Sequence, residues 1–183
     1  NHLDPDLTLA TLPNLSPVRS GEMVATIKVI PFAVPFGLVA AAQKRAAQSL
    51  AECGGLIRIA PFVPRRMGLI LTRTQGLPES ILDRAAAAQR VRAERLSSQI
   101  VEEQRCSHDE ESVKESLRSL SAAGCDPILV LGASAIVDRR DVIPSAIESV
   151  GGQIVQLGMP VDPGNLLLLG TIGSTTVIGV PGC

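Results

Sequence analysis

Short apolar runs alternate with longer amphipathic segments along most of this chain, from about residue 56 to residue 180. Apolar runs of about four to eight residues predict strands, whereas longer segments closed by glycine or serine predict helices. The expected strands are 56–63, 67–72, 100–104, 127–131, 154–157, 166–169 and 175–180, and the expected helices are 78–96, 109–122 and 142–150. This alternation predicts an α/β fold in three layers, with a mostly parallel sheet between helices on both of its faces.

The first 55 residues differ from the rest because prolines separate their extended segments. Threonine, valine and isoleucine are frequent in 7–12 and 23–30, which predicts two strands. An alanine-rich helix is expected over 36–52, ended by Gly54 and Gly55. We therefore expect a small, β-rich N-terminal extension over 1–55, followed by an α/β domain over 56–183.

The stretch 129–144 is the strongest indication of a ligand site. An apolar run leads into a loop of small residues, then two arginines, then Asp141 at the start of a helix. Small side chains let backbone N–H groups approach a ligand, and N–H groups and helix N-termini favour anions, phosphate above all. The expected binding residues in this stretch are Gly132, Ala133, Ser134, Ala135, Arg139 and Arg140. The sequence thus predicts a site for a phosphorylated small molecule, although small residues are also common in loops that bind nothing.

Two aspartates, Asp109 and Asp141, fall where ligands sit in such folds, outside the carboxyl ends of strands. If the two preceding strands are neighbours, both carboxylates face one crevice and could hold Mg²⁺ beside phosphate oxygens. The alternative is structural: Ser107 and Glu110 would form a capping box, with Asp109 only a first-turn acid. Asp141 would then be an N-cap. The alternative for Arg139 and Arg140 is that both side chains point into solvent.

Composition excludes several classes of partner. The net charge is −1 and aromatic residues make up 2% of the chain, so we expect no nucleic acid partner. Apolar runs are far shorter than the roughly 20 residues of a membrane span. Four scattered cysteines and two histidines do not suggest a zinc site, and unpaired cysteines fit a reducing cytoplasm. We assign no function to His108 or to the cysteines. The chain begins at Asn1 rather than methionine, so we expect a fragment of a longer protein.

The region 67–183 resembles the Mog-type molybdopterin-binding domains of molybdenum cofactor biosynthesis. The resemblance rests on the apolar strand, the small-residue loop and the Arg-Arg-Asp-Val-x-Pro run at 139–144, and on two Pro-Gly turns. It implies that the pterin phosphate binds at Gly132–Ala135 and that Asp109 and Asp141 serve Mg²⁺ and the reaction site. Further binding residues are expected around the same crevice, namely Thr72, Pro163, Gly164, Asn165, Pro181 and Gly182.

This chain departs from the pattern of the family at several positions. The family loop is usually Gly-Gly-Thr-Gly or Gly-Gly-Thr-Ser, where this chain has Gly132-Ala-Ser-Ala135. If the second position needs a positive φ, alanine there costs about 1–2 kcal/mol, so a different loop path is expected. Asn165 and Leu166 stand where the family often has lysine and proline, and Cys183 replaces a usual asparagine.

We therefore expect a molybdopterin-binding domain that takes the pterin phosphate, with a nucleotide and Mg²⁺, at the carboxyl ends of the strands. Its activity would be nucleotidyl transfer or molybdate insertion. The alternative is a non-catalytic binding or oligomerisation module serving a nucleotidyltransferase. The first segment, 1–55, is similar to a bacterial subgroup in which such a domain is fused to a nucleotidyltransferase. We also expect a cytoplasmic homo-oligomer without a membrane partner. A purely structural domain with a vestigial site is the third possibility.

Overall fold

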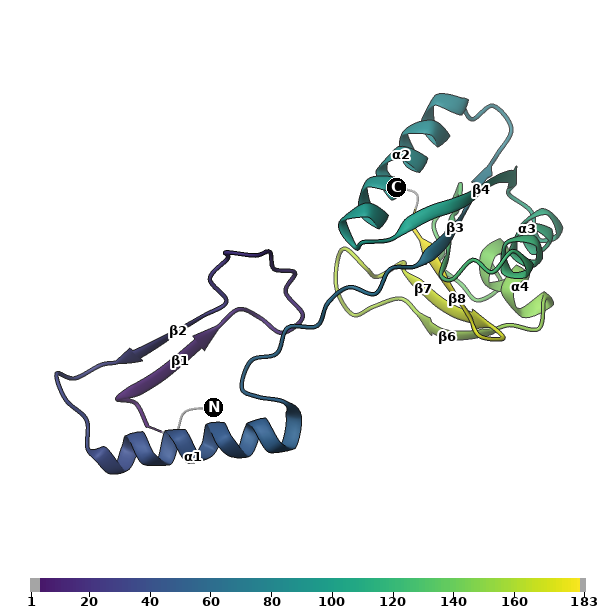
Figure 1. Ribbon diagram of the computed structural model, residues 1–183. Coiled ribbons are helices and arrows are strands. Elements are labelled where there is room, and N and C mark those ends of the chain that lie inside the picture. Colours follow the sequence, from purple (N-terminus) through teal and green to yellow (C-terminus); the bar gives the residue numbers. More distant parts are fainter. Residues whose placement is uncertain (1–3, 182–183) are drawn as a thin grey trace. The chain divides into compact units, whose positions relative to one another are not determined.

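A computed structural model describes residues 4–181, and the chain divides into two compact units, Asn1–Ala60 and Pro61–Cys183 (Figure 1). The division falls within the segment 56–63, which the sequence pattern assigns to a strand. That strand is absent: residues 56–65 form neither strand nor helix. Pro61 and Pro64 explain the difference, because proline has no N–H to donate to a neighbouring strand.

The second unit is built on one mixed sheet with the strand order β4-β3-β5-β8-β7-β6. β3 pairs in parallel with β4 and β5, and β5 pairs in parallel with β8. β7 runs antiparallel to both β8 and β6. The strands are β3 (Arg66–Arg73), β4 (Gln99–Ser107), β5 (Ile128–Leu131), β6 (Gln153–Leu157), β7 (Leu168–Ile172) and β8 (Thr175–Val180). β4 is longer than the sequence predicts, and β7 begins later because 162–166 form a turn.

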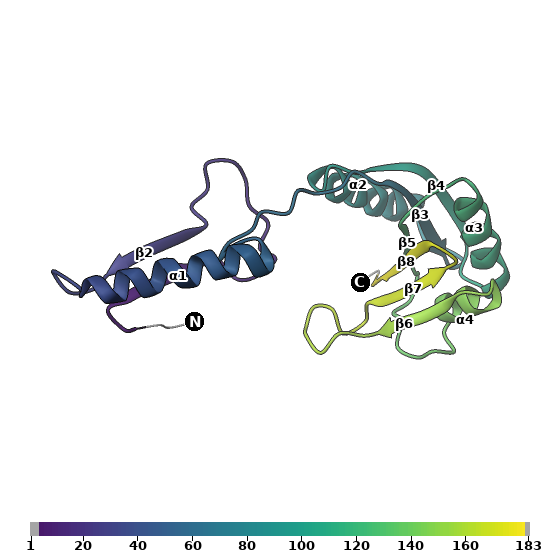
Figure 2. The same cartoon turned by 60° about the horizontal axis from the view of Figure 1, so that its bottom comes forward.

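Helices cover both faces of this sheet, which confirms the predicted three-layer α/β fold (Figure 2). Successive side chains of a strand point to opposite faces. Leu69 and Leu71 therefore pack on one face with Leu82 of α2, whereas Ile70 packs on the other with α3 and α4. The helices are α2 (Glu79–Arg95), α3 (Glu110–Ala122) and α4 (Val142–Ser149). All four residues of β5 are buried, as its uninterrupted apolar run predicts.

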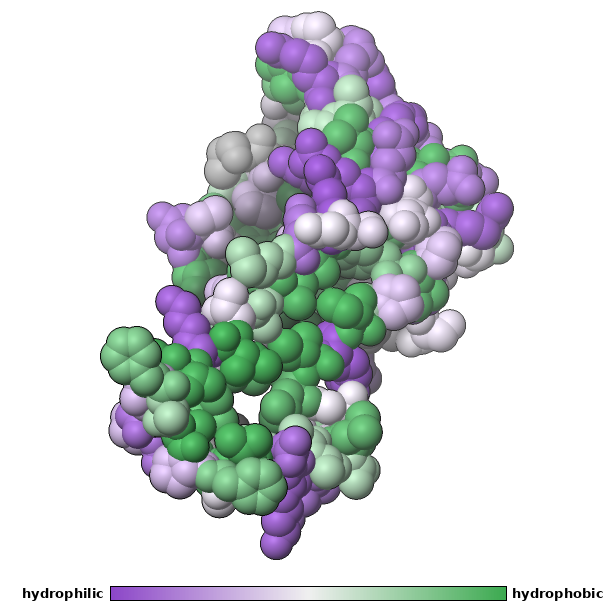
Figure 3. Space-filling model, turned by 60° about the vertical axis from the view of Figure 1, so that its left-hand side comes forward, coloured by the Kyte–Doolittle hydropathy of each residue, from purple (hydrophilic) through white to green (hydrophobic). Residues whose placement is uncertain are grey.

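The first unit is constructed differently. Its strands β1 (Leu7–Thr11) and β2 (Ala25–Val29) form an antiparallel pair, and α1 (Phe36–Cys53) follows, all near their predicted bounds. No residue of 4–60 is buried. Large apolar side chains are instead exposed, among them Met23, Ile27, Phe32 and Phe36, and Figure 3 shows apolar residues gathered in the lower part of the view. In residues 4–181 no helix is long and apolar enough to cross a membrane.

Because the two units differ in burial, we expect them to differ in stability when each is produced as a separate fragment. A fragment over 61–183 keeps both core clusters and should unfold cooperatively in urea. Its far-UV circular dichroism spectrum should be typical of an α/β fold. A fragment over 1–60 has only a two-stranded sheet and buries no residue among those described, so it should show little fixed structure. Loss of cooperative unfolding in the 61–183 fragment would contradict this expectation.

Candidate functional site

Five connecting segments of the second unit lie at the same end of the sheet. The parallel strands β3, β4, β5 and β8 all end there, and so does β6, because two antiparallel steps restore its direction. The segments are 74–78, 108–109, 132–141, 158–167 and the residue Pro181. We call 132–141 the β5 loop. This edge is where open α/β sheets place their ligands, and it carries nearly all of the predicted site residues.

Three side chains from three different segments are joined by hydrogen bonds at this edge. Thr72 Oγ1 lies 2.7 Å from His108 Nδ1, and His108 Nε2 lies 2.8 Å from Ser134 Oγ. Thr72 also accepts the Ala133 N–H at 2.7 Å. We call Thr72, His108 and Ser134 the hydroxyl–imidazole relay. Thr72 and Ser134 were predicted as binding residues, and the relay brings them together.

His108 is the site residue that sequence reasoning missed. It follows β4 directly, and its backbone N–H donates to the Arg73 carbonyl at 2.9 Å, which continues the pairing of β4 with β3. A lone histidine in a polar stretch has no spacing that indicates a partner. The only signal in the sequence is its position directly after a strand, at the edge where ligands sit in such folds.

The β5 loop presents free backbone donors. The N–H groups of Ser134 and Ala135 make no hydrogen bond with any residue in 4–181. Ser134 is exposed and Ala135 is half-buried, so neither residue is closed off from solvent. Ala133 does not have a positive φ, since Leu15 and Ser97 are the only non-glycine residues of the described chain that do. The predicted conformational cost of alanine at this position therefore does not arise.

Gly132 is required by close packing rather than by its backbone angles. A Cβ at this position would lie 2.8 Å from the Ser134 carbonyl oxygen and 2.9 Å from Ile143 Cδ1. It would also lie 3.5 Å from His108 Cε1. Only glycine lets the β5 loop fold back this tightly between the relay and the first turn of α4.

Asp109 caps α3. Its Oδ1 accepts the Ser112 N–H at 2.9 Å, and its Oδ2 accepts the Ser112 hydroxyl at 2.8 Å. These two hydrogen bonds hold the pKa of Asp109 below its usual value. The capping box expected from Ser107 and Glu110 is wrong, because Asp109 occupies the N-cap and Glu110 instead bonds to the Ser149 hydroxyl of α4.

The Asp141 side chain is hydrogen-bonded to the backbone of the β5 loop. It stands at the N-cap position of α4, as one interpretation expects, but its side chain makes no capping bond to that helix. Its Oδ2 instead accepts the N–H groups of Val137 and Asp138, at 2.7 and 2.8 Å. The carboxylate therefore fixes the path of the loop that precedes it.

The two carboxylates do not assemble a magnesium site. β3 lies between β4 and β5, so the strands that precede Asp109 and Asp141 are not neighbours, and two strand spacings separate them by roughly 10 Å. Each carboxylate is also bonded within its own segment. In the described part of the chain, no three His, Cys, Asp or Glu residues are grouped to hold a metal. These residues do not fit a preformed Mg²⁺ site.

Arg139 and Arg140 are exposed and only loosely paired. Arg139 Nη1 lies 3.9 Å from Glu148 Oε1, and Arg140 Nε lies 3.7 Å from Asp138 Oδ1. The Arg140 side chain is 95% exposed. Ion pairs of this kind contribute little to stability, so both guanidinium groups can turn toward an anion at little cost.

The remaining predicted residues lie apart from the relay. Pro163, Gly164 and Asn165 belong to the β6–β7 connection, which its own bonds close, including Met159 N–H to the Gly164 carbonyl at 3.0 Å. β7 and β6 are two and three strands away from β5. Pro181 follows β8, which is next to β5, whereas Gly182 is outside the described residues.

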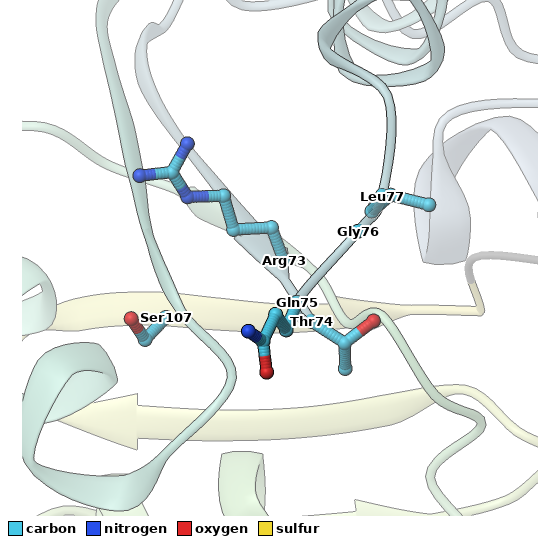
Figure 4. Close-up of a pocket in the computed structure, with 6 residues that line it drawn as sticks. All are labelled: Arg73, Thr74, Gln75, Gly76, Leu77 and Ser107. Carbon is cyan, nitrogen blue, oxygen red and sulfur yellow. The ribbon is translucent and has the colours of Figure 1, made fainter.

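A hollow of about 320 Å³ lies at the ends of β3 and β4, beside the relay in sequence (Figure 4). Arg73 follows Thr72 in the sequence, and Ser107 precedes His108, so the lining of the hollow and the relay include consecutive residues. The lining is mostly polar and consists of Arg73, Thr74, Gln75, Gly76, Leu77 and Ser107. Arg73 is held by Glu79 at 2.7 Å. None of these six residues was predicted as part of the site.

Comparison with solved structures defines the class of fold. The molybdopterin biosynthesis MoeA protein from Pyrococcus horikosii is similar over 76% of this chain, with a TM-score of 0.50 and 19% identity. A molybdenum cofactor biosynthesis protein B is similar over 68% of this chain and 84% of its own length, with a TM-score of 0.50 and 16% identity. This chain covers 35% of the MoeA chain. No protein-family model and no curated protein sequence matches the chain.

The chain thus shares its fold with a MoeA protein and with a molybdenum cofactor biosynthesis protein B. At this level of identity the similarity establishes the fold alone.

Replacing Gly132 by alanine should loosen the β5 loop. The new methyl group meets a backbone carbonyl and a buried isoleucine, and overpacking of this kind costs about 1–3 kcal/mol of unfolding free energy. Urea denaturation of the 61–183 fragment would measure the loss. Ala133→Ser in the same fragment is the control, because it also adds an atom to the β5 loop but at an exposed position. Equal effects of the two substitutions would contradict the packing argument.

Asp109 should make the unfolding free energy of the second unit depend on pH in the acid range. Its folded pKa is lowered, so the charge of Asp109 stabilises the fold above the unfolded pKa of about 3.9. That contribution disappears as pH falls through the folded pKa. Asp109→Asn keeps an N-cap acceptor but removes the charge. Its unfolding free energy should be below that of the unsubstituted chain at neutral pH, and the difference should shrink toward zero in acid. A difference that grows in acid would contradict this assignment.

Proposed function

We propose that the β5 loop binds the phosphate group of molybdopterin and that the chain acts in molybdenum cofactor biosynthesis. The observation that carries this proposal is the pair of unbonded N–H groups at Ser134 and Ala135, beside the exposed Ser134 hydroxyl. N–H groups left unpaired in an ordered loop are donors for an anion. The fold supports a pterin as the rest of the ligand, since a protein named for molybdopterin biosynthesis shares it.

Charge at the loop favours the same ligand. Arg139 and Arg140 follow the free donors in sequence and are not held by close ion pairs. A phosphate bound by N–H groups, a hydroxyl and a guanidinium would have its charge balanced and its oxygens hydrogen-bonded. The more distant parts of the ligand would contact five further residues, Pro163, Gly164, Asn165, Pro181 and Gly182. Thr72 would act indirectly, through its hydrogen bond with the Ala133 N–H and through the relay.

Two forms of this function differ in chemistry. In the first, the chain transfers a nucleotidyl group or inserts molybdate by positioning phosphates, with Asp109 and Asp141 at the reacting groups. In the second, it is a non-catalytic binding or oligomerisation module that serves a fused or separate nucleotidyltransferase. One observation favours the second: both carboxylates are bonded to donors within their own segments. Nucleotide-dependent turnover by the chain alone distinguishes the two forms.

A homo-oligomer and a cytoplasmic location are part of the same proposal. Cys53, Cys106 and Cys125 are free thiols, as a reducing compartment allows. Burial raises the pKa of the Cys106 and Cys125 thiols, which keeps them protonated and unreactive at neutral pH. Sedimentation of the full chain tests the assembly state.

Removing the phosphate donors should weaken the binding of molybdopterin. Ser134→Ala removes one hydrogen bond to the charged phosphate, so we expect affinity to fall about tenfold or more. The double substitution Arg139→Ala and Arg140→Ala should cost about tenfold or more at low salt, and less as salt screens the charges. Titration followed by pterin fluorescence measures both effects.

Arg92→Ala is the matched control for charge, because Arg92 is exposed near the end of α2, on the opposite face of the sheet from α4. Dephosphorylated molybdopterin is the matched control for the ligand and should bind more weakly than the phosphorylated form. Equal affinity for the two ligands would show that the phosphate is not recognised, and the proposal would then fail.

A further inference from the structure

The hydrogen bonds around Thr72 allow an arrangement of protons in which His108 carries its proton on Nδ1. Thr72 Oγ1 has one proton and two acceptor lone pairs, and one lone pair takes the Ala133 N–H at 2.7 Å. The Leu131 carbonyl lies 3.4 Å away and can take the Thr72 proton. The other lone pair then accepts a proton from His108 Nδ1 at 2.7 Å. This arrangement satisfies every recorded contact of the hydroxyl.

With its proton on Nδ1, the His108 ring leaves Nε2 free to accept. In this tautomer the Ser134 hydroxyl, whose Oγ lies 2.8 Å from Nε2, donates to the imidazole. A hydroxyl that donates to a histidine held in place by a third group is the arrangement that activates a serine nucleophile. Thr72, which is only 1% exposed, is the third group here, and Ser134 at the other end is exposed.

One further feature fits chemistry at Ser134. The N–H groups of Ser134 and Ala135 have no partner in residues 4–181 and could stabilise an oxyanion. The 320 Å³ hollow is not part of this site, because Thr72, His108 and Ser134 do not line it and Arg73 points toward α2. No unpartnered buried side chain or grouped metal ligands point to another reaction in the described residues.

We propose that Ser134 is the nucleophile of an acyl-transfer site that takes carboxylic esters. His108 is its general base and Thr72 is a positioning residue. This activity is separate from the proposed function and does not need a pterin, although it uses the same hydroxyl.

The reaction proceeds in two balanced steps. In the first, Ser134 Oγ attacks the ester carbonyl carbon while its proton passes to His108 Nε2. The tetrahedral intermediate then expels the alcohol, which takes that proton from His108, and an acyl-serine remains. In the second step, His108 removes a proton from water, whose oxygen attacks the acyl carbon. The bond to Ser134 Oγ breaks, Oγ regains the proton, and a carboxylic acid leaves.

The test is covalent labelling of the full chain with a fluorophosphonate, read by peptide mass spectrometry, together with release of p-nitrophenol from p-nitrophenyl acetate. Labelling should occur on Ser134 and should be lost in Ser134→Ala. His108→Gln should slow labelling and turnover about a hundredfold or more, the range for loss of a general base. The ionisation seen in the pH profile of the unsubstituted chain should be missing in this variant.

Matched variants separate activation from folding. Ser80→Ala removes an exposed serine on α2 and should change neither rate, whereas Cys53→Ser removes the exposed thiol as a source of background turnover. Thr72→Val keeps the shape of the buried side chain but removes its hydroxyl, and it should slow labelling. Thr72→Ser should restore it. Circular dichroism checks that each variant is folded.

The outcomes decide the proposal. Labelling of Ser134 no faster than of other exposed serines, or labelling that His108→Gln leaves unchanged, means that the relay only pins the loop, and the proposal fails. Protection of Ser134 by molybdopterin would support both proposals. Labelling without any binding of molybdopterin would support the nucleophile and overturn the proposed function alone.

Discussion

The parallel pairing of β3 with β4 on one side and β5 on the other is the constraint on which the site depends. It brings three strand ends to one edge, so residues 72, 108 and 134 meet although they are far apart in sequence. Thr72 lies at the centre of this arrangement because its hydroxyl contacts both neighbouring strands or their loops. Without that order of strands, His108 could not bridge Thr72 and Ser134.

The fold could be predicted from the sequence because its elements have clear local patterns. The apolar run of β5 indicates a strand buried on both faces, and alternation of strands with helices indicates covering layers. The segment 56–63 misled the prediction because its apolar residues resemble a strand while its prolines prevent pairing. Periodicity records which side chains are apolar, whereas pairing also depends on available N–H groups.

The site could be located but not assembled from the sequence. The β5 loop was identified from its small residues, and Ser134 and Thr72 lie together as expected of one site. His108 was missed because its partners depend on the order of strands, which no local pattern contains. For a similar reason the sequence could not show that Asp141 bonds to its own loop, or that a strand separates the segments that carry Asp109 and Asp141. Residue type alone does not reveal which donors a carboxylate will meet.

The scarcity of histidine gives the relay a practical consequence. The chain contains two imidazole rings, His2 and His108, and His108 bridges two hydroxyl groups. The magnetic resonance signals of imidazole are therefore few enough to assign by a single substitution. A ligand bound at the β5 loop would change the surroundings of the His108 ring. The signal of that ring can therefore report ligand binding at the loop.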